Sequence, residues 1–197
     1  MQKIVLASQN AKKIKELQAL LGDLGDFEIL PQSVFNIPEA DEPFDSFIEN
    51  ALNKARNASK FSGMPALADD SGLCVLALKN APGVHSARFA GEPKSDERNN
   101  QKLLESLKNE TDRRAFFVCV FVAVRFEKDP LPLVAQGVWH GTILKTPQGK
   151  NGFGYDPIFQ PEGFQQSAAE LSDSEKNAIY HRSRALAQFK KLFKECF

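Results

Sequence analysis

Two adjacent aspartates stand out at the edge of an apolar run. Asp69 and Asp70 lie in "ALADDSGL", and Ser71 and Gly72 follow them directly. Neighbouring carboxylates repel each other, and such a pair is typical of sites for Mg²⁺, which prefers oxygen ligands and shares its shell with phosphates. One carboxylate would alternatively hold or deprotonate a water molecule. Because Asp, Ser and Gly also favour β-turns, a plain turn is the competing interpretation.

A cationic segment follows the first apolar run of the chain. Residues 8–16 read "SQNAKKIKE" and join a β-branched run to a helical pattern. A helix that starts there offers free backbone N–H groups and the positive end of its dipole, which together favour an anion. Lys12 and Lys13 fall in the first turn, where a cation is disfavoured unless a phosphate binds there. An ordinary solvated helix start is the alternative.

Two further polar segments complete the set. Residues 39–42, "EADE", form an acidic loop, and residues 149–157, "GKNGFGYDP", form a glycine-rich loop with two aromatic rings. Residues 175–185, "EKNAIYHRSRA", add cations and a histidine. Aromatic rings beside amide and cationic donors can stack on a base and bind its edge. The sequence has no P-loop and no kinase motif set, which argues against ordinary kinases and P-loop NTPases. Cations, an acidic pair and aromatic rings together indicate a nucleoside triphosphate with Mg²⁺.

The elements that must position these residues follow from hydrophobic periodicity. We expect strands over residues 3–7, 67–78, 116–126 and 133–144, with the second interrupted by a turn at residues 69–72. We expect helices from Ile14 to Leu21, over residues 44–61 with Asp45 as N-cap, over residues 95–109, and from Ser172 onward as one helix with a Ser-x-x-Glu capping box. Residues 116–126, "FFVCVFVAVRF", are apolar on both faces and should lie centrally in the sheet. The alternation predicts a mixed α/β or α+β fold, a sheet with helices on both faces.

Bulk composition limits the function classes. The 197 residues are 42% apolar and carry 25 basic against 25 acidic side chains, which argues against a general nucleic-acid binder and against an acidic disordered chain. Cys74, Cys119 and Cys196 have no metal-ligand spacing, so we expect free thiols in a reducing cytoplasm. We expect no signal peptide, no membrane helix and no membrane partner. The length favours a single domain over residues 1–197.

Taken in order, six segments resemble the inosine/xanthosine triphosphate pyrophosphatases, which remove noncanonical purine nucleotides. The segments are "LASQNAKKIKEL", "FIENALNKA", "ALADDSGLCV", "APGVHSARFAG", "GFGYDPIF" and "AELSDSEKNAIYHRSRAL". The resemblance runs from Ile4 to about Leu186. It implies hydrolysis of ITP, dITP and XTP to the nucleoside monophosphate and pyrophosphate, dependence on Mg²⁺, a homodimer, and an elongated mixed sheet with two lobes around a nucleotide-binding cleft.

The resemblance also assigns roles to residues of this chain. Asp70 would be the general base and a metal ligand, Asp69 its support, and Glu42 a metal ligand with Asp41 beside it. The triphosphate would be held by Ser8, Gln9, Asn10, Ala11, Lys12 and Lys13. The substrate would also contact Ser71, Phe153, Gly154, Tyr155, Asp156, Lys176, His181 and Arg182. Ser86 and Arg88 match a further motif without a firm role.

This chain departs from the family pattern at two positions. Gln9 stands where the family commonly has a small residue, and Ser183 stands where it has a glycine. A pyrophosphatase for pyrimidine or other modified nucleotides, or a nucleotide sensor without catalysis, are the alternative functions. The acidic residues beside a phosphate site favour an enzyme over a sensor. Donors aimed at a 6-oxo group would reject the 6-amino group of adenine.

Overall fold

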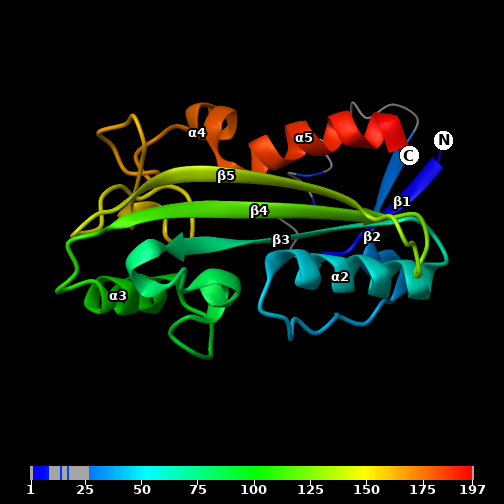
Figure 1. The fold of residues 1–197 in the computed structure, drawn as a ribbon, viewed down its shortest axis with the longest axis horizontal. Coiled ribbons are helices and arrows are strands. Elements are labelled where there is room, and N and C mark those ends of the chain that lie inside the picture. The colour runs from blue at the N-terminus through cyan, green and yellow to red at the C-terminus, as the bar shows by residue number, and fades with distance from the viewer. Residues whose placement is uncertain (1, 9–13, 15–16, 18–26, 197) are drawn as a thin grey trace. The chain divides into compact units, whose positions relative to one another are not determined.

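The protein is a mixed α/β structure, seen here in a computed structural model that describes residues 2–8, 14, 17 and 27–196 (Figure 1). Within these residues, six strands form one sheet in the order β2-β1-β3-β4-β5-β6. The strands are β1 Gln2–Leu6, β2 Phe27–Pro31, β3 Ala66–Val75, β4 Arg114–Val124, β5 Leu133–Ile143 and β6 Phe159–Pro161. The pairs β1–β2 and β1–β3 are parallel and β5–β6 is antiparallel, so the predicted mixed sheet is confirmed.

The α-helices are α2 Phe47–Ser62, α3 Asp96–Ser106, α4 Asp173–Ile179 and α5 His181–Cys196. Among the described elements, α2 follows β2, α3 follows β3, and α4 and α5 follow β6, whereas β4 and β5 are consecutive. Short 3₁₀ segments are η1 Gln32–Phe35, η2 Leu76–Leu78, η3 Gly83–Arg88 and η4 Asp156–Ile158. The helix expected from Ile14 to Leu21 falls mostly outside the described residues, although Ile14 and Leu17 themselves pack in the core. No helix within residues 2–8, 14, 17 and 27–196 is long and apolar enough to cross a membrane.

The strand expected over residues 116–126 is the central one, as predicted. β4 lies between β3 and β5 in the sheet, and its residues from Val118 to Val124 are all buried. Burial on both faces explains why apolar residues occupy successive positions instead of alternating with polar ones. The neighbouring strand expected over residues 133–144 is β5, which is also confirmed.

The chain divides into two compact units. Unit 1 comprises residues 1–70, 119–137 and 184–197, and unit 2 comprises residues 71–118 and 138–183. Unit 1 has its own core, in which Phe121 of β4 packs on Phe189 of α5. In this unit α2 and α5 cover opposite faces of the strands (Figure 1).

Unit 2 has a second core that is rich in aromatic rings. Phe117 packs edge-on against Phe159 at 4.7 Å between ring centroids, and the Trp139 ring centroid lies 5.2 Å from that of Phe159. Leu103 and Leu107 of the α3 segment are fully buried in this cluster. The strand segments of this unit have α3 on one face and α4 on the other (Figure 1).

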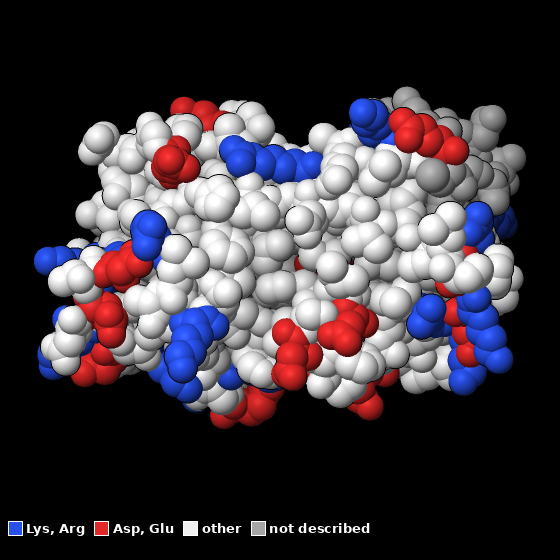
Figure 2. Space-filling view, viewed as in Figure 1, with Lys and Arg blue, Asp and Glu red and all other residues white. Residues whose placement is uncertain are grey.

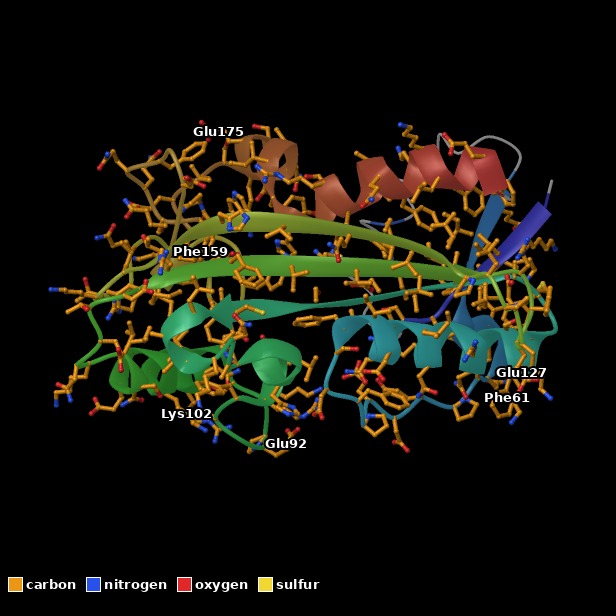
Figure 3. All side chains as sticks on the ribbon, viewed as in Figure 1. Phe61, Glu92, Lys102, Glu127, Phe159 and Glu175 are labelled. Atoms are coloured by element: carbon orange, nitrogen blue, oxygen red, sulfur yellow. The ribbon has the colours of Figure 1, made fainter. Side chains whose placement is uncertain are left out.

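Two predicted helix ends need correction. The helix expected over residues 44–61 begins at Phe47, and its N-cap is Ser46 rather than Asp45, because the Ser46 hydroxyl accepts a hydrogen bond from the Glu49 backbone. The helix expected from Ser172 is two helices, since Tyr180 is extended and places its ring in the unit 2 core. The predicted capping box is present: Ser172 and Glu175, the latter labelled in Figure 3, bond reciprocally.

Candidate active site

The acidic pair lies in the middle of a continuous strand. β3 runs from Ala66 to Val75 without a break, so the turn predicted at residues 69–72 is wrong. Asp69 and Asp70 are 3% and 8% exposed, which means that both carboxylates sit in a largely buried strand. Burying charge is costly unless an opposite charge lies close by. The strand therefore requires a cation near the pair.

That cation is Lys54 of α2, a residue that sequence reasoning did not single out. Its ammonium donates to Glu42 Oε1 at 2.8 Å and lies 3.6 Å from Asp70 Oδ1. The Lys54 side chain is 15% exposed, against 32% for Glu42 and 12% for Asp70. We call Glu42, Lys54, Asp69 and Asp70 the carboxylate–lysine cluster; all four belong to unit 1.

The acidic loop that carries Glu42 is held in place by side chains of α2. Asn50 accepts from the Phe44 N–H at 3.1 Å and donates to the Phe44 carbonyl at 3.0 Å. Further along the helix, Asn53 and Asn57 donate to the carbonyls of Asp41 and Pro38, each at 2.9 Å. The spacing of the three asparagines and Lys54 places them on adjoining helix positions that face the loop. This pattern in "FIENALNKARN" is the signal that could have identified Lys54.

The electrostatics of the cluster favour a charged lysine. Burial lowers the pKa of Lys54, but the negative charges of Asp70, Asp69 and Glu42 outweigh burial and raise this pKa above its ordinary value. A cation is thus stable at this point, where carboxylates from the loop and from β3 converge.

A second cluster forms around Phe153 in the glycine-rich loop, residues 149–157, which we call the aromatic loop. The ring of Phe153 is 60% exposed, so a face of it is open to a stacking partner. Asp156 accepts from the Phe153 N–H at 2.9 Å and from the Lys176 ammonium at 2.5 Å. The same ammonium lies 5.1 Å from the centroid of the Phe153 ring. The structure thus brings Phe153, Asp156 and Lys176 together.

A glycine is required next to Phe153. Gly152 has a φ of +77°, and a Cβ there would come within 2.2 Å of Asp156 Oδ2. Only a residue without a side chain allows the Asp156 carboxylate to reach the loop backbone. Gly154 also has a positive φ, +63°.

The other predicted residues of unit 2 have mainly inward-facing contacts. The Tyr155 hydroxyl donates to the Ser86 carbonyl at 2.8 Å, and burial raises the pKa of Tyr155 above its ordinary value. His181 is buried and stacks on Phe117 at 5.0 Å with an interplanar angle of 13°. Arg182 is 2% exposed, with its guanidinium 5.9 Å from the Tyr180 ring centroid.

The motif around Ser86 has a structural role in this fold. The Ser86 hydroxyl accepts from the Leu73 N–H at 2.9 Å and donates to the Gly83 carbonyl at 2.6 Å, so it fastens η3 to β3. At the departure position, the Ser183 hydroxyl donates to the Tyr180 carbonyl at 2.9 Å. The added hydroxyl therefore has a local backbone partner.

The predicted phosphate segment is described only at its first residue. Ser8 follows β1, and its N–H donates to the Leu6 carbonyl at 2.9 Å. Gln9, Asn10, Ala11, Lys12 and Lys13 lie outside the described residues. Ser71 directly follows Asp70 in β3 and is partly buried.

The donors in the carboxylate–lysine cluster suit a hard cation. Among the residues that the structure describes, no three His, Cys, Asp or Glu side chains form a closed metal site. Mg²⁺ does not need one, because it is commonly held by one or two carboxylates together with substrate phosphates and water. Glu42 and Asp70 are two such carboxylates, and both already point an oxygen at one cationic group, Lys54. These residues fit Mg²⁺.

The fold and the two clusters define a class: a mixed α/β protein whose unit 1 gathers carboxylates around one lysine and whose unit 2 exposes an aromatic ring on a glycine-rich loop. A family model described as "Ham1 family" matches residues 4–192, and the chain belongs to this family. A relative from Aromatoleum aromaticum called "dITP/XTP pyrophosphatase" is 60% identical over 184 residues, 93% of this chain and 92% of its own.

Solved structures are similar to this chain over nearly its whole length. A HAM1 protein from Coxiella burnetii is 50% identical, with a TM-score of 0.96 and full coverage of both chains. A structure named nucleoside-triphosphatase / dITP/XTP pyrophosphatase from Mycobacterium abscessus is 42% identical, with a TM-score of 0.81 over 94% of this chain and 96% of its own.

Proposed function

We propose that this protein hydrolyses noncanonical purine nucleoside triphosphates (ITP, dITP and XTP) to the nucleoside monophosphate and pyrophosphate. The observation that carries the proposal is the carboxylate–lysine cluster: Lys54 holds Glu42 and Asp70 together in a chain 60% identical to a relative called dITP/XTP pyrophosphatase. Buried, oppositely charged groups of this kind create the fixed field that phosphoryl chemistry needs.

Glu42 and Asp70 would hold Mg²⁺ in this reaction. When bound, Mg²⁺ neutralises charge on the triphosphate and makes its phosphorus easier to attack. The two carboxylates come from different elements, and α2 fixes their separation through Lys54 and the asparagines that hold the acidic loop.

Asp70 is proposed to orient the attacking water and to accept its proton. A general base must be within hydrogen-bond reach of the proton that it removes and must be ionised at working pH. The ammonium of Lys54, 3.6 Å from Asp70 Oδ1, favours the ionised carboxylate. Asp69 supports the negative potential of the pair, and Ser71 contacts the substrate beside it.

The triphosphate is proposed to bind at the start of the chain. Ser8 and the segment Gln9, Asn10, Ala11, Lys12 and Lys13 would supply backbone N–H groups and two cationic side chains. Asn10 and Lys13 are the strongest candidates there, because the resemblance matches them most closely.

The base is proposed to stack on the exposed Phe153 ring. Lys176 Nζ has three N–H donors and uses one on Asp156, so donors remain for a 6-oxo group of hypoxanthine or xanthine. Adenine presents a 6-amino donor at that position and would leave donor facing donor. His181 and Arg182 are proposed to contact the base, and Gly154, Tyr155 and Asp156 shape the loop.

Three broader properties belong to the same proposal. The family match over residues 4–192 supports a single pyrophosphatase domain. The buried free thiol of Cys74 supports a reducing, cytoplasmic setting. The homodimer rests on the family resemblance, and light scattering after gel filtration would test it.

Product identification tests the function directly. The protein is incubated with Mg²⁺ and, separately, ITP, dITP, XTP, ATP, GTP and dCTP. We expect pyrophosphate and the monophosphate from the first three and much slower release from the others. Release of orthophosphate and a diphosphate would contradict the proposal, as would equal rates on ATP and ITP, and a preference for dCTP would favour a pyrimidine pyrophosphatase.

A further inference from the structure

The exposed Phe153 ring stands on a short stretch of backbone that is fully hydrogen-bonded. Within the loop, Asp156 accepts from the Phe153 N–H at 2.9 Å, and the Asp156 N–H donates to the Phe153 carbonyl at 3.3 Å. The N–H and carbonyl groups of the next residue, Gly154, both bond to residues outside the loop. Both of these groups are bonded to side chains of α3.

Two residues of α3 hold Gly154 from both sides. The Gly154 N–H donates to Asp96 Oδ2 at 2.7 Å, and Asn100 Nδ2 donates to the Gly154 carbonyl at 3.0 Å. Asp96 and Asn100 are four residues apart on the helix, so they present their side chains on one face. We call this pair the α3 clamp.

The helix that provides the clamp is itself well fixed. The Ser95 hydroxyl accepts from the Arg98 N–H and caps the helix, and Leu103 and Leu107 anchor its other end in the unit 2 core. Asn100 is 9% exposed, which restricts its side chain to few conformations. The clamp therefore transfers the rigidity of a packed helix to a surface loop.

The neighbouring asparagine shows that the clamp is separate from ordinary fold support. Asn99 accepts from the Ala90 N–H at 2.7 Å and donates to the Ser86 and Ala87 carbonyls at 3.3 and 3.2 Å. Asn99 thus holds η3 and the residues after it, whereas the side-chain amide of Asn100 donates to the aromatic loop.

We propose that Asp96 and Asn100 are positioning residues for the nucleobase, because they hold Gly154 and thereby fix the Phe153 ring in the orientation that stacks on a purine. The inference rests on the proposed function and deepens it. An apolar ring on a free glycine-flanked loop would sample many orientations, and ordering it on binding would weaken affinity. A ring held in advance avoids that loss.

The expected effect is on base binding and not on the chemical step. We expect Asp96→Ala or Asn100→Ala to raise KM for ITP and Kd for IMP by about tenfold, the size of a lost pre-organising contact, with kcat changed less than about twofold. Asp96→Asn keeps an acceptor oxygen for the Gly154 N–H and should restore most of the affinity.

Glu97→Ala is the matched control, since Glu97 is the other acidic residue in the first turn of α3. Both acids interact with the helix dipole, so a loss that comes only from helix stability appears in Glu97→Ala as well. Thermal unfolding of every variant measures that contribution.

A double-mutant cycle with Phe153→Ala decides whether the clamp acts through the ring. IMP binding is measured by calorimetry for the wild type, Asn100→Ala, Phe153→Ala and the double variant, and for the same cycle with Asp96→Ala. We expect the clamp variants to have little further effect once the ring is absent. Equal losses with and without Phe153, an effect of Glu97→Ala as large as that of Asp96→Ala, or unchanged IMP binding would overturn the inference.

The IMP measurement also separates this inference from the function. If the wild type binds IMP through the clamp but releases no pyrophosphate from ITP, the proposed reaction is wrong and the clamp stands. If the wild type releases pyrophosphate from ITP but the clamp variants bind IMP as tightly as the wild type does, the clamp inference is wrong and the proposed reaction stands.

Discussion

The carboxylate–lysine cluster and the aromatic loop are held in place in opposite ways. The cluster consists of charged side chains on regular elements, with Asp69 and Asp70 inside a buried strand and Lys54 in the middle of a helix. The aromatic loop exposes its main side chain, Phe153, and depends on hydrogen bonds from Asp156 and α3 for its shape.

This difference matches the two tasks. Stabilising charge in a reaction requires fixed charges shielded from water, where electrostatic interactions are strong. Stacking on a base requires an accessible ring face, so the ring must be exposed and the rigidity must come from the backbone beneath it. Substitutions in the cluster should therefore change kcat and stability, whereas substitutions in the loop should change KM.

The largest expected effect is that of Asp70→Asn. Replacing the proposed general base should lower kcat for ITP by about a thousandfold, with IMP binding retained. Pyrophosphate release and calorimetry measure the two quantities. Asp45→Asn, an exposed carboxylate of the same unit, serves as the control and should leave kcat unchanged. Full turnover in Asp70→Asn would remove this residue from the mechanism.

Next in size is Lys54→Met, which removes the cation that Glu42 and Asp70 share. Breaking a buried ion pair leaves uncompensated charge, so we expect the free energy of unfolding to fall by about 3 kcal/mol and kcat to fall by about a hundredfold. Urea unfolding and steady-state kinetics measure these changes.

Lys60→Met, on an exposed position of the same helix, controls for loss of a lysine from α2. Equal losses of stability in the two variants would show that Lys54 has no special electrostatic role, and the contrast between cluster and loop would then fail.

Phe153→Ala should have a smaller effect than the cluster variants, and the effect should be on KM and not on kcat. Losing one stacking surface should raise KM for ITP by about tenfold, while kcat and the unfolding free energy stay near the wild-type values, because the ring is mostly exposed. Phe126→Ala removes a ring that is 52% exposed in unit 1 and is the matched control. A fall in kcat as large as that of Asp70→Asn would contradict the separation of roles.

The smallest effect is a pH dependence of stability. Because the pKa of Lys54 is raised in the folded protein, its stabilising contribution is complete below the unfolded pKa of about 10.4 and is lost as the pH rises through the folded pKa. The difference in unfolding free energy between wild type and Lys54→Met should stay constant from pH 7 to 9. It should then shrink by at most about 1.4 kcal/mol per pH unit above pH 10.4. A difference that grows between pH 7 and 9 would show that the folded pKa is lowered instead, and a difference that stays flat above pH 10.4 would show that it is not shifted.

The face drawn in Figure 2 carries both signs of charge. On the face drawn in Figure 2, the described Lys and Arg side chains lie in small groups interspersed with Asp and Glu. Such a mixture lacks the one-sided field that a general nucleic-acid binder presents. The equal number of basic and acidic residues predicted this property without a structure.

Local signals were sufficient for most of the elements. The apolar run of β4, the capping box before α4 and the glycine after α2 each depend on residues within a few positions of one another. The continuity of β3 through Asp69-Asp70-Ser71-Gly72 was not predictable in this way. Turn-forming residues lie within a strand there because the charge of Lys54 on another element compensates the buried carboxylates.

By itself, the sequence determined the mixed α/β class, the central strand, the acidic pair and the aromatic loop, because each depends on residues that are close together in the chain. Only the tertiary structure decided which residues meet: Lys54 with Glu42 and Asp70, and Asp96 and Asn100 with Gly154, the last pair 54 positions apart. These contacts depend on how elements pack, and packing brings together residues whose separation in sequence carries no periodic signal.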